Sequence, residues 1–402
     1  MTVEILALGV ACNLSCQYCY QNPLRDVGNT RDSYDLDAIK RAVLSTGQPM
    51  ALFGGEPLLM AKADIEDLLA WGHERSDHSL IQSNGVLIDD DHIRMFRAYN
   101  VHVGISIDGP GALNDARWDG TLARTRAATA KTEAAIARLC AENIPVGLIV
   151  TAHRVNCAPE NLPVFLDWLR DLAALGVRTV RLHMLEVETE EVGAKYQLST
   201  EECLSLLQAL DDLGRELPPD FIDVFHDMAR ALRGEDENIG CVWRGCDPYT
   251  TAAVRGIQGN GQITNCGCTN KSGVNFVKAD RPGYERYLAL YQTPQAHHGC
   301  AGCRFFLMCK GKCPGTAVDG DWRNRTAECA LWMARYELLE TRALAAGATP
   351  LSQHHRRLEV ERMMLQAWAN GVNPSLTHVL AQLGMKIEDL AVPPTSTAGA
   401  EA

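Results

Sequence analysis

The chain has 402 residues, of which 46% are hydrophobic and 22% charged, and a formal net charge of −12. This length suits one large or two medium domains with an ample hydrophobic core. An acidic chain without a lysine- or arginine-rich run is disfavoured for general binding to nucleic acid or to an anionic membrane, because both need a basic footprint. We therefore expect neither as a partner.

The 15 cysteines are the main clue in the composition. The uncharged stretches 5–24 and 363–385 contain too many polar residues to span a bilayer, and no lysine or arginine precedes the first, as a signal peptide would require. Without an export signal we expect a cytoplasmic protein. In a reducing compartment, clustered cysteines are read first as metal or catalytic sites.

Short apolar segments alternate with helical patterns over the first half of the chain. Strands are expected at 3–10, 50–53, 80–82, 101–107, 146–150 and 179–184, and helices at 35–46, 62–73, 89–98, 121–141 and 160–175. Such alternation predicts a parallel sheet with right-handed crossovers, here an α/β fold with a partial (β/α)6, TIM-like barrel. Reactive groups then belong at the carboxyl ends of the strands.

The second half changes character. Helices are expected at 200–215, 219–233 and 356–369, whereas residues 240–326 are rich in glycine and cysteine and need metal or disulfide to stay folded. The expected domains are the barrel (1–215), a helical linker (216–240), a cysteine-rich domain (241–330), C-terminal helices (331–392) and a disordered tail (393–402).

The first cysteine set is Cys12, Cys16 and Cys19, in a loop that leaves the first strand. Three thiolates at this spacing supply three of the four ligands of a four-iron cluster and leave one iron open to a substrate or cofactor. A partial zinc site is the alternative, but no histidine or fourth cysteine lies nearby in the sequence.

This triplet, with the aromatic Tyr18 before its last cysteine, resembles the signature of the radical SAM enzymes. The resemblance implies that these three cysteines hold a 4Fe-4S cluster that binds S-adenosylmethionine. It also implies reductive cleavage of that cofactor to a 5′-deoxyadenosyl radical, with electrons from a flavodoxin- or ferredoxin-type reductant.

Further motifs follow three of the expected strands in the order that the family shows. Cofactor contacts are implied for Gly54, Gly55, Glu56, Pro57, Ser83, Asn84, Ser106 and Asp108. The glycines allow close approach of the backbone, and carbonyl and carboxylate oxygens suit an ammonium group. Asn-Gly and Asp-Gly are also common turn sequences, which is the structural alternative for the last four residues.

The second cysteine set begins with Cys241 and Cys246, continues with Gly261-x4-Cys266, and ends with Cys300-x2-Cys303-x5-Cys309-x3-Cys313 and Cys329. This spacing resembles the SPASM extension of radical SAM enzymes that modify peptides and proteins. The resemblance implies two auxiliary 4Fe-4S clusters, making three in all: one on Cys241, Cys246, Cys266 and Cys313, the other on Cys300, Cys303, Cys309 and Cys329. Two four-cysteine zinc sites need the same ligands and are the alternative. Cys268 is left over, and Cys140, Cys157 and Cys203 read as small buried hydrophobes.

One position departs from the family pattern. SPASM enzymes that oxidise a serine or cysteine of sulfatases carry an acid directly after the third cysteine of this set, where this chain has Gly267. The sulfatase-maturase hypothesis therefore lacks its proton acceptor, and no other catalytic residue is assigned from the sequence.

We expect an enzyme that oxidatively modifies a ribosomally synthesised peptide, forming a carbon–carbon or thioether cross-link. Because only 11 residues precede Cys12, a separate leader-binding protein is an expected partner besides the precursor peptide. The alternatives are a radical SAM dehydrogenase or rearrangement enzyme acting on a small natural-product intermediate, and a non-catalytic binding protein stabilised by metal.

Overall fold

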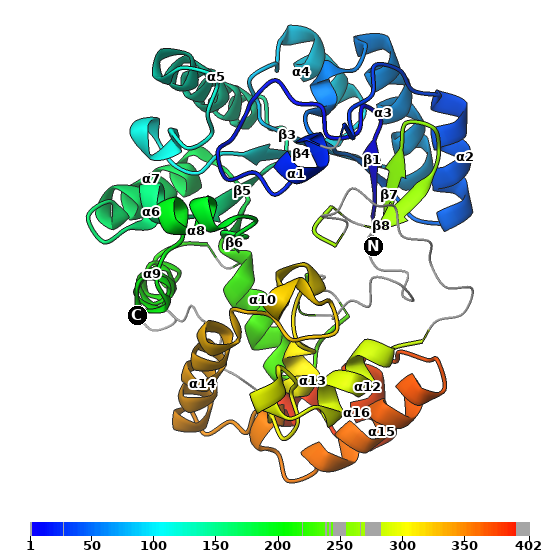
Figure 1. Cartoon of the computed structure of the whole chain (residues 1–402), viewed down its shortest axis with the longest axis vertical. Helices are drawn as coiled ribbons and strands as arrows, with labels where there is room; N and C mark the ends of the chain where they lie inside the picture. Colours follow the sequence, from blue (N-terminus) through cyan, green and yellow to red (C-terminus); the bar gives the residue numbers. More distant parts are fainter. Residues whose placement is uncertain are drawn as a thin grey trace, which may run out of the picture. The chain divides into compact units, whose positions relative to one another are not determined.

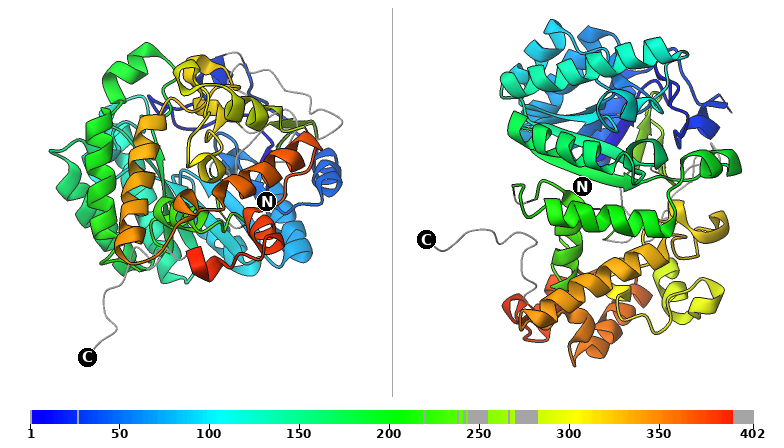
Figure 2. Two further views of the ribbon diagram at one scale, coloured as in Figure 1. Left: turned by 90° about the horizontal axis from the view of Figure 1, so that it is seen from below. Right: turned by 90° about the vertical axis from the view of Figure 1, so that its left-hand side faces the viewer.

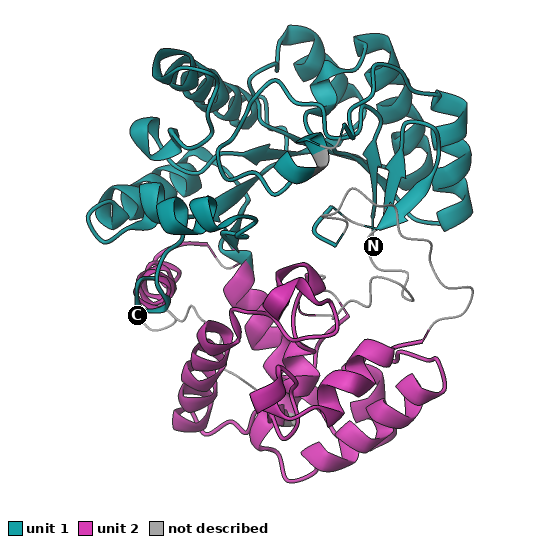
Figure 3. Ribbon diagram, viewed as in Figure 1, with its two compact units in different colours: residues 1–202, 221–223, 254–275 teal, residues 203–220, 224–253, 276–402 magenta. Residues whose placement is uncertain are grey.

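The computed structural model describes residues 2–26, 28–218, 220–237, 239–240, 243, 255–265, 267–269 and 283–390. The chain forms two compact units (Figure 3): unit 1 comprises 1–202, 221–223 and 254–275, and unit 2 comprises 203–220, 224–253 and 276–402. Among the described helices, none has both the length and the hydropathy of a membrane span. The expected disordered tail, 393–402, lies outside the described residues.

Unit 1 is built on an eight-stranded sheet in the order β6-β5-β4-β3-β2-β1-β7-β8 (Figure 1). The strands are β1 (Val3–Leu6), β2 (Met50–Leu52), β3 (Ser79–Ser83), β4 (Val101–Ser106), β5 (Val146–Ala152), β6 (Thr179–Met184), β7 (Arg255–Gln258) and β8 (Ile263–Asn265). Every pair is parallel except β7 with β8. All six predicted strands are present, and the α/β partial-barrel prediction is confirmed.

Helices connect the strands of unit 1 as predicted. They are α1 (Asn22–Asp26), α2 (Leu36–Thr46), α3 (Lys62–Ser76), α4 (Asp90–Ala98), α5 (Leu122–Ala141), α6 (Arg154–Cys157), α7 (Leu162–Leu175) and α8 (Glu190–Tyr196), with the 3-10 turns η1 (Pro57–Leu59) and η2 (Gly111–Asn114). The side chains of Asp35, Asp89 and Thr121 accept hydrogen bonds from the first turns of α2, α4 and α5. These N-caps fix the residue at which each of the three helices begins.

The two faces of the sheet differ in chemistry. Residues on one face, such as Val103, Leu148 and Val180, are buried. The alternate residues, among them His102, Gly104 and Arg181, line a cavity of about 520 Å³ within unit 1. Period-two alternation therefore separates a buried apolar layer from the side chains that face the cavity.

The first strand is shorter than predicted. The sequence predicted strand through residue 10, whereas β1 ends at Leu6. Gly9 lies in the left-handed region (φ +61°), and a Cβ there would approach the Asn29 carbonyl oxygen to 2.3 Å. The buried residues Ala7 and Val10 therefore belong to a tight loop, which turns the chain toward the first cysteines.

The hairpin of β7 and β8 was not predicted. Gly256 packs against Thr264, Gly259 packs against the Ala7 carbonyl, and Gly261 (φ +80°) makes the turn. These glycines allow residues 255–265 to lie along β1, although the sequence assigned them to the cysteine-rich domain. The compact units therefore divide the chain differently from the expected functional domains, because 255–265 lies in unit 1 and 283–330 in unit 2.

Unit 2 is helical, as predicted for the C-terminal part. Its helices are α9 (Thr200–Leu213), α10 (Asp223–Leu232), α12 (Glu285–Gln292), α13 (Phe306–Cys309), α14 (Cys329–Ala345), α15 (Arg357–Ala369) and α16 (Leu376–Gln382), with 3-10 turns at η3 (Gln295–His297), η4 (Pro314–Thr316), η5 (Val318–Gly320), η6 (Leu351–Gln353) and η7 (Ile387–Leu390). Helices α9 and α14 lie side by side (Figures 1 and 2), where buried Asp211 accepts hydrogen bonds from Arg335 and Arg342.

Candidate active site

The loop after β1 gathers the first three cysteines. Cys12, Cys16 and Cys19 pack in one cluster with Leu14 and Ala128. Burial, together with the neighbouring thiols of Cys19 and Cys12, raises the pKa of Cys16 to about 12. Three thiols that influence one another from a single loop are a donor set that fits a cluster with one open iron.

A second segment holds this loop in place. The Ser15 amide donates to the Trp118 carbonyl oxygen (2.8 Å), and the Gln17 amide donates to the Ala116 carbonyl oxygen (3.0 Å). The cysteine loop is thus paired with residues 116–118, which come from the turn between β4 and α5. Nothing in the sequence motifs indicated this pairing.

The Gly54–Pro57 motif packs directly on the cysteine loop. The Glu56 amide donates to the Ala11 carbonyl oxygen at 2.8 Å, next to Cys12. A Cβ on Gly55 would lie 2.0 Å from that oxygen and 2.4 Å from the Val10 carbonyl oxygen. Gly54 adopts φ +124°, which side chains rarely allow. Both glycines are therefore required for the contact between the two loops.

Gly55→Ala is expected to lower the free energy of unfolding by about 3 kcal/mol, because backbone carbonyls cannot move aside cheaply. The matched control is Gly47→Ala, at an open left-handed helix end with nothing within 4 Å. It is expected to cost only about 1 kcal/mol. Urea unfolding of both variants measures the difference, and equal losses would contradict the packing role of Gly55.

The carboxylate of Glu56 joins the ends of β2 and β3. It accepts hydrogen bonds from the Ser83 hydroxyl (2.8 Å), the Asn84 amide (2.8 Å) and the Leu58 amide (3.0 Å), and Glu56 is only 1% exposed. Burial raises the pKa of Glu56, while these donors oppose the rise. The Glu56 carboxylate therefore braces the ends of these two strands, and the ammonium site expected at this motif stays a prediction.

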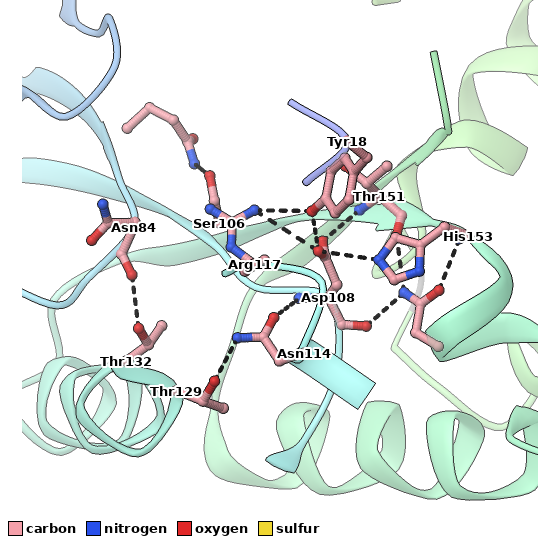
Figure 4. Close-up of polar contacts among 12 residues, drawn as sticks. Tyr18, Asn84, Ser106, Asp108, Asn114, Arg117, Thr129, Thr132, Thr151 and His153 are labelled. Atoms are coloured by element: carbon pink, nitrogen blue, oxygen red, sulfur yellow. Dashed lines mark hydrogen bonds and ion pairs between the residues drawn. The ribbon is translucent and has the colours of Figure 1, made fainter. Parts of the chain in front are cut away.

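Asn84 and Ser106 lie on neighbouring strand ends (Figure 4). The Asn84 side-chain amide donates to Asn13 Oδ1 at 2.7 Å, beside Cys12, and the Asn84 carbonyl accepts from Thr132. The Ser106 hydroxyl accepts from Gln82 Nε2 at 2.9 Å. The structure therefore brings the segments after β1, β2, β3 and β4 together at one edge of the sheet, as the sequence predicted.

Both carboxylate oxygens of Asp108 contact protein groups (Figure 4). Its side chain is fully buried, and its Oδ2 accepts from the Tyr18 hydroxyl, while Oδ1 accepts from the Thr151 amide at 2.9 Å. Burial would raise the pKa of Asp108, but hydrogen bonds and charges from His153, Arg117 and Tyr18 outweigh it and hold the pKa below its ordinary value. Asp108 thus contacts protein groups behind the cysteine loop.

Four cysteines of the second set come together in unit 2. Burial raises the pKa of Cys300, and Cys309, Cys303 and Cys329 raise it further, so the four thiols lie within electrostatic reach of one another. This set equals the ligand group implied for one auxiliary cluster. Cys313 is partly buried in the same unit, whereas Cys241, Cys246 and Cys266 lie outside the described residues.

A fully buried arginine organises the chain between these cysteines. The Arg286 guanidinium donates to the carbonyl oxygens of Trp322 (2.6 Å), Lys310 (3.1 Å) and Asn324 (3.1 Å). One side chain from α12 thus fixes the loop that separates Cys309 from Cys329.

In the part of the chain that the structure describes, no three His, Cys, Asp or Glu side chains are placed to hold a single metal ion.

The leftover cysteine lies in unit 1. A Cβ on Gly267 would lie 3.0 Å from the Tyr20 ring, and burial raises the pKa of Tyr20 together with the charges of Cys268 and Glu4. The segment after β8 therefore reaches the residue that follows Cys19.

Comparison with protein families identifies the domain that contains these strand ends. The radical SAM superfamily profile matches residues 6–159, which contain the triplet and all the motif segments described above. These residues form a radical SAM domain.

Proteins of known activity match the radical SAM domain in part. The chain is 30% identical over 167 residues to the Fe-coproporphyrin III synthase of Methanosarcina barkeri, covering 40% of this chain and 39% of that protein. It is 28% identical over 206 residues to the serine-type anaerobic sulfatase-maturating enzyme of Klebsiella aerogenes, covering 48% and 49%. The matched regions thus cover less than half the length of each of these two relatives.

A solved structure resembles the chain beyond the radical SAM domain. The structure of native anSMEcpe with bound AdoMet and a Cp18Cys peptide matches with a TM-score of 0.64 and 17% identity, over 86% of this chain and 98% of that one. At this identity the match shows a shared fold.

Proposed function

We propose that the protein is a radical S-adenosylmethionine enzyme that oxidatively modifies a ribosomally synthesised peptide by forming a carbon–carbon or thioether cross-link. The carrying observation is the gathering of three thiols on the loop after β1, against the ends of β2, β3 and β4. Thiolate ligands of this kind need a reducing compartment, which we propose to be the cytoplasm.

Cys12, Cys16 and Cys19 would hold a 4Fe-4S cluster, and S-adenosylmethionine would bind on its open iron. When bound, the pair supplies a 5′-deoxyadenosyl radical that removes a hydrogen atom from an unactivated carbon. The backbone of Gly54 and Gly55 would approach the cofactor, with Asn84 and Ser106 beside it. Tight packing of the Gly54–Pro57 motif on the cysteine loop supports this placement, because it fixes both segments relative to each other.

Two auxiliary clusters are part of the proposal. Cys300, Cys303, Cys309 and Cys329 would hold one, and Cys241, Cys246, Cys266 and Cys313 the other. The mutual influence of the first four thiols supports their assignment. Such clusters would accept the second electron when a cross-link closes, and a flavodoxin- or ferredoxin-type protein would supply the reducing electron.

The peptide substrate is supported by the shared fold with anSMEcpe, whose structure contains a bound peptide. Gly267, which has no side chain to accept a proton, stands where the sulfatase-maturase pattern has an acid. We therefore propose a different peptide modification, with a separate leader-binding protein as a partner.

A small-molecule substrate is the second candidate. It is favoured by the 30% identity to Fe-coproporphyrin III synthase over part of the radical SAM domain. This candidate would retain the cofactor site and replace the peptide by a compact natural-product intermediate.

Co-expression with short peptides encoded beside the gene separates the two candidates. A cross-linking enzyme is expected to lower the peptide mass by one hydrogen molecule per cross-link, with fragment ions missing across the linked residues. Co-expression with the Cys16→Ala variant is the control and should leave the mass unchanged. An unchanged mass for every neighbouring peptide would favour the small-molecule substrate.

A further inference from the structure

We propose that Arg117 and the fully buried Asp108 form a pair of opposite charges that sets the reduction potential of the cluster held by Cys12, Cys16 and Cys19. This inference rests on the proposed function, because it concerns the cluster at the triplet. Arg117 and Asp108 are positioning residues, because they act on the cluster through Cys16 and Tyr18 and do not hold it themselves.

Backbone pairing places Arg117 opposite Cys16. The amides of residues 15 and 17 in the cysteine loop donate to the carbonyl oxygens of residues 118 and 116. Cys16 lies between these two hydrogen bonds on one segment, and Arg117 lies between them on the other. The charge of Arg117 lowers the pKa of Cys16 against the larger effect of burial, which agrees with its position opposite this residue.

The aspartate side of the pair joins the same loop through Tyr18 (Figure 4). Arg117 Nη1 donates to the Tyr18 hydroxyl at 3.3 Å and lies 3.9 Å from Asp108 Oδ2, and the Tyr18 hydroxyl donates to that same oxygen. His153 Nε2 lies 3.5 Å from Asp108 Oδ2 on the opposite side. Asp108 itself is held by Asn114, which accepts from its amide at 2.8 Å.

Little water reaches these charges. Asp108 is fully buried and the Arg117 side chain is only 13% exposed. Tyr18, which contacts both, packs with Ala116, Leu185 and Tyr196 in an apolar cluster. Fixed charges act more strongly on a neighbour in such a low-dielectric environment than they do at the surface. Charge, hydrogen bonding and solvent exposure around the cysteine sulfurs are the features by which proteins set the potential of iron–sulfur clusters.

The two charges are expected to act in opposite directions. Reduction adds negative charge, so Arg117 favours the reduced state and Asp108 disfavours it. Arg117→Gln should therefore lower the midpoint potential, and Asp108→Asn should raise it. We expect each single variant to change the one-electron reduction equilibrium at least tenfold, which is about 59 mV, and the double variant to return toward the wild-type value.

Redox titration of anaerobically reconstituted protein, followed by electron paramagnetic resonance, measures these potentials. The signal that changes on addition of S-adenosylmethionine identifies the cluster at the triplet. The matched control is Arg126→Gln, which removes an arginine that pairs with Asp115 at 3.0 Å and whose side chain is 53% exposed. Its potential should equal that of the wild-type protein.

Shifts of the same sign in both single variants, or shifts no larger than that of the control, would overturn the proposal. If Asp108→Asn does not retain the cluster, Arg117→Lys decides: it keeps the charge and should keep the wild-type potential, whereas Arg117→Gln should lower it. Equal potentials for these two variants would refute the electrostatic role. A wild-type protein without a cluster at the triplet would instead refute the proposed function.

Discussion

Cys16→Ala is expected to remove the cluster at the triplet and to reduce release of 5′-deoxyadenosine to the assay background. Cys16 is the buried central thiol of the three, and it interacts with both Cys12 and Cys19. Two remaining thiolates cannot complete the three-ligand set that a cluster with one open iron requires. Iron analysis after anaerobic reconstitution should therefore show about four iron atoms fewer per chain than in the wild-type protein.

The matched control for this experiment is Cys140→Ala. Cys140 is a partly buried cysteine on helix α5, and burial raises the pKa of its thiol. This variant should keep the wild-type iron content and the wild-type release of 5′-deoxyadenosine. Equal iron contents in Cys16→Ala and Cys140→Ala would contradict the assignment of the triplet.

Glu56→Gln is expected to destabilise the protein by about 3 kcal/mol and to abolish the stabilisation that S-adenosylmethionine provides. The carboxylate accepts from Leu58, Ser83 and Asn84, whereas the amide group of glutamine would present hydrogens to one of these donors. A buried donor without an acceptor costs about 1–3 kcal/mol, and the ends of β2 and β3 would then separate.

Thermal unfolding with and without the cofactor measures both effects. The control is Glu142→Gln, which removes a surface ion pair with Arg97 (3.0 Å) and should cost at most about 1 kcal/mol. If Glu56→Gln kept the wild-type stability and the wild-type shift with S-adenosylmethionine, the brace between the two strand ends would be refuted.

The strands and the segments that follow them could be predicted because their signals are local. Apolar runs such as 101–107 and helices such as 121–141 show their periodicity within a single window. Since parallel strands end at one edge, the prediction also brought the Gly54–Pro57 motif to the cysteine loop.

Other features depend on contacts between distant residues. Strands β7 and β8 are short and glycine-rich, and only pairing with β1 makes them strands. The sequence motif also gave no sign that the Asp108 carboxylate would accept hydrogen bonds from Tyr18 and Thr151. Arg117 lies in no motif, and its place opposite Cys16 follows from backbone pairing that no spacing in the sequence encodes.

Release of 5′-deoxyadenosine by the wild-type protein tests the central claim most directly. Anaerobically reconstituted protein is mixed with S-adenosylmethionine and a low-potential reductant, and the products are quantified by mass spectrometry. The structure predicts formation of 5′-deoxyadenosine and methionine by the wild-type protein. Quantitative recovery of intact S-adenosylmethionine, from protein shown to contain iron–sulfur clusters, would contradict the claim that this chain is a radical enzyme.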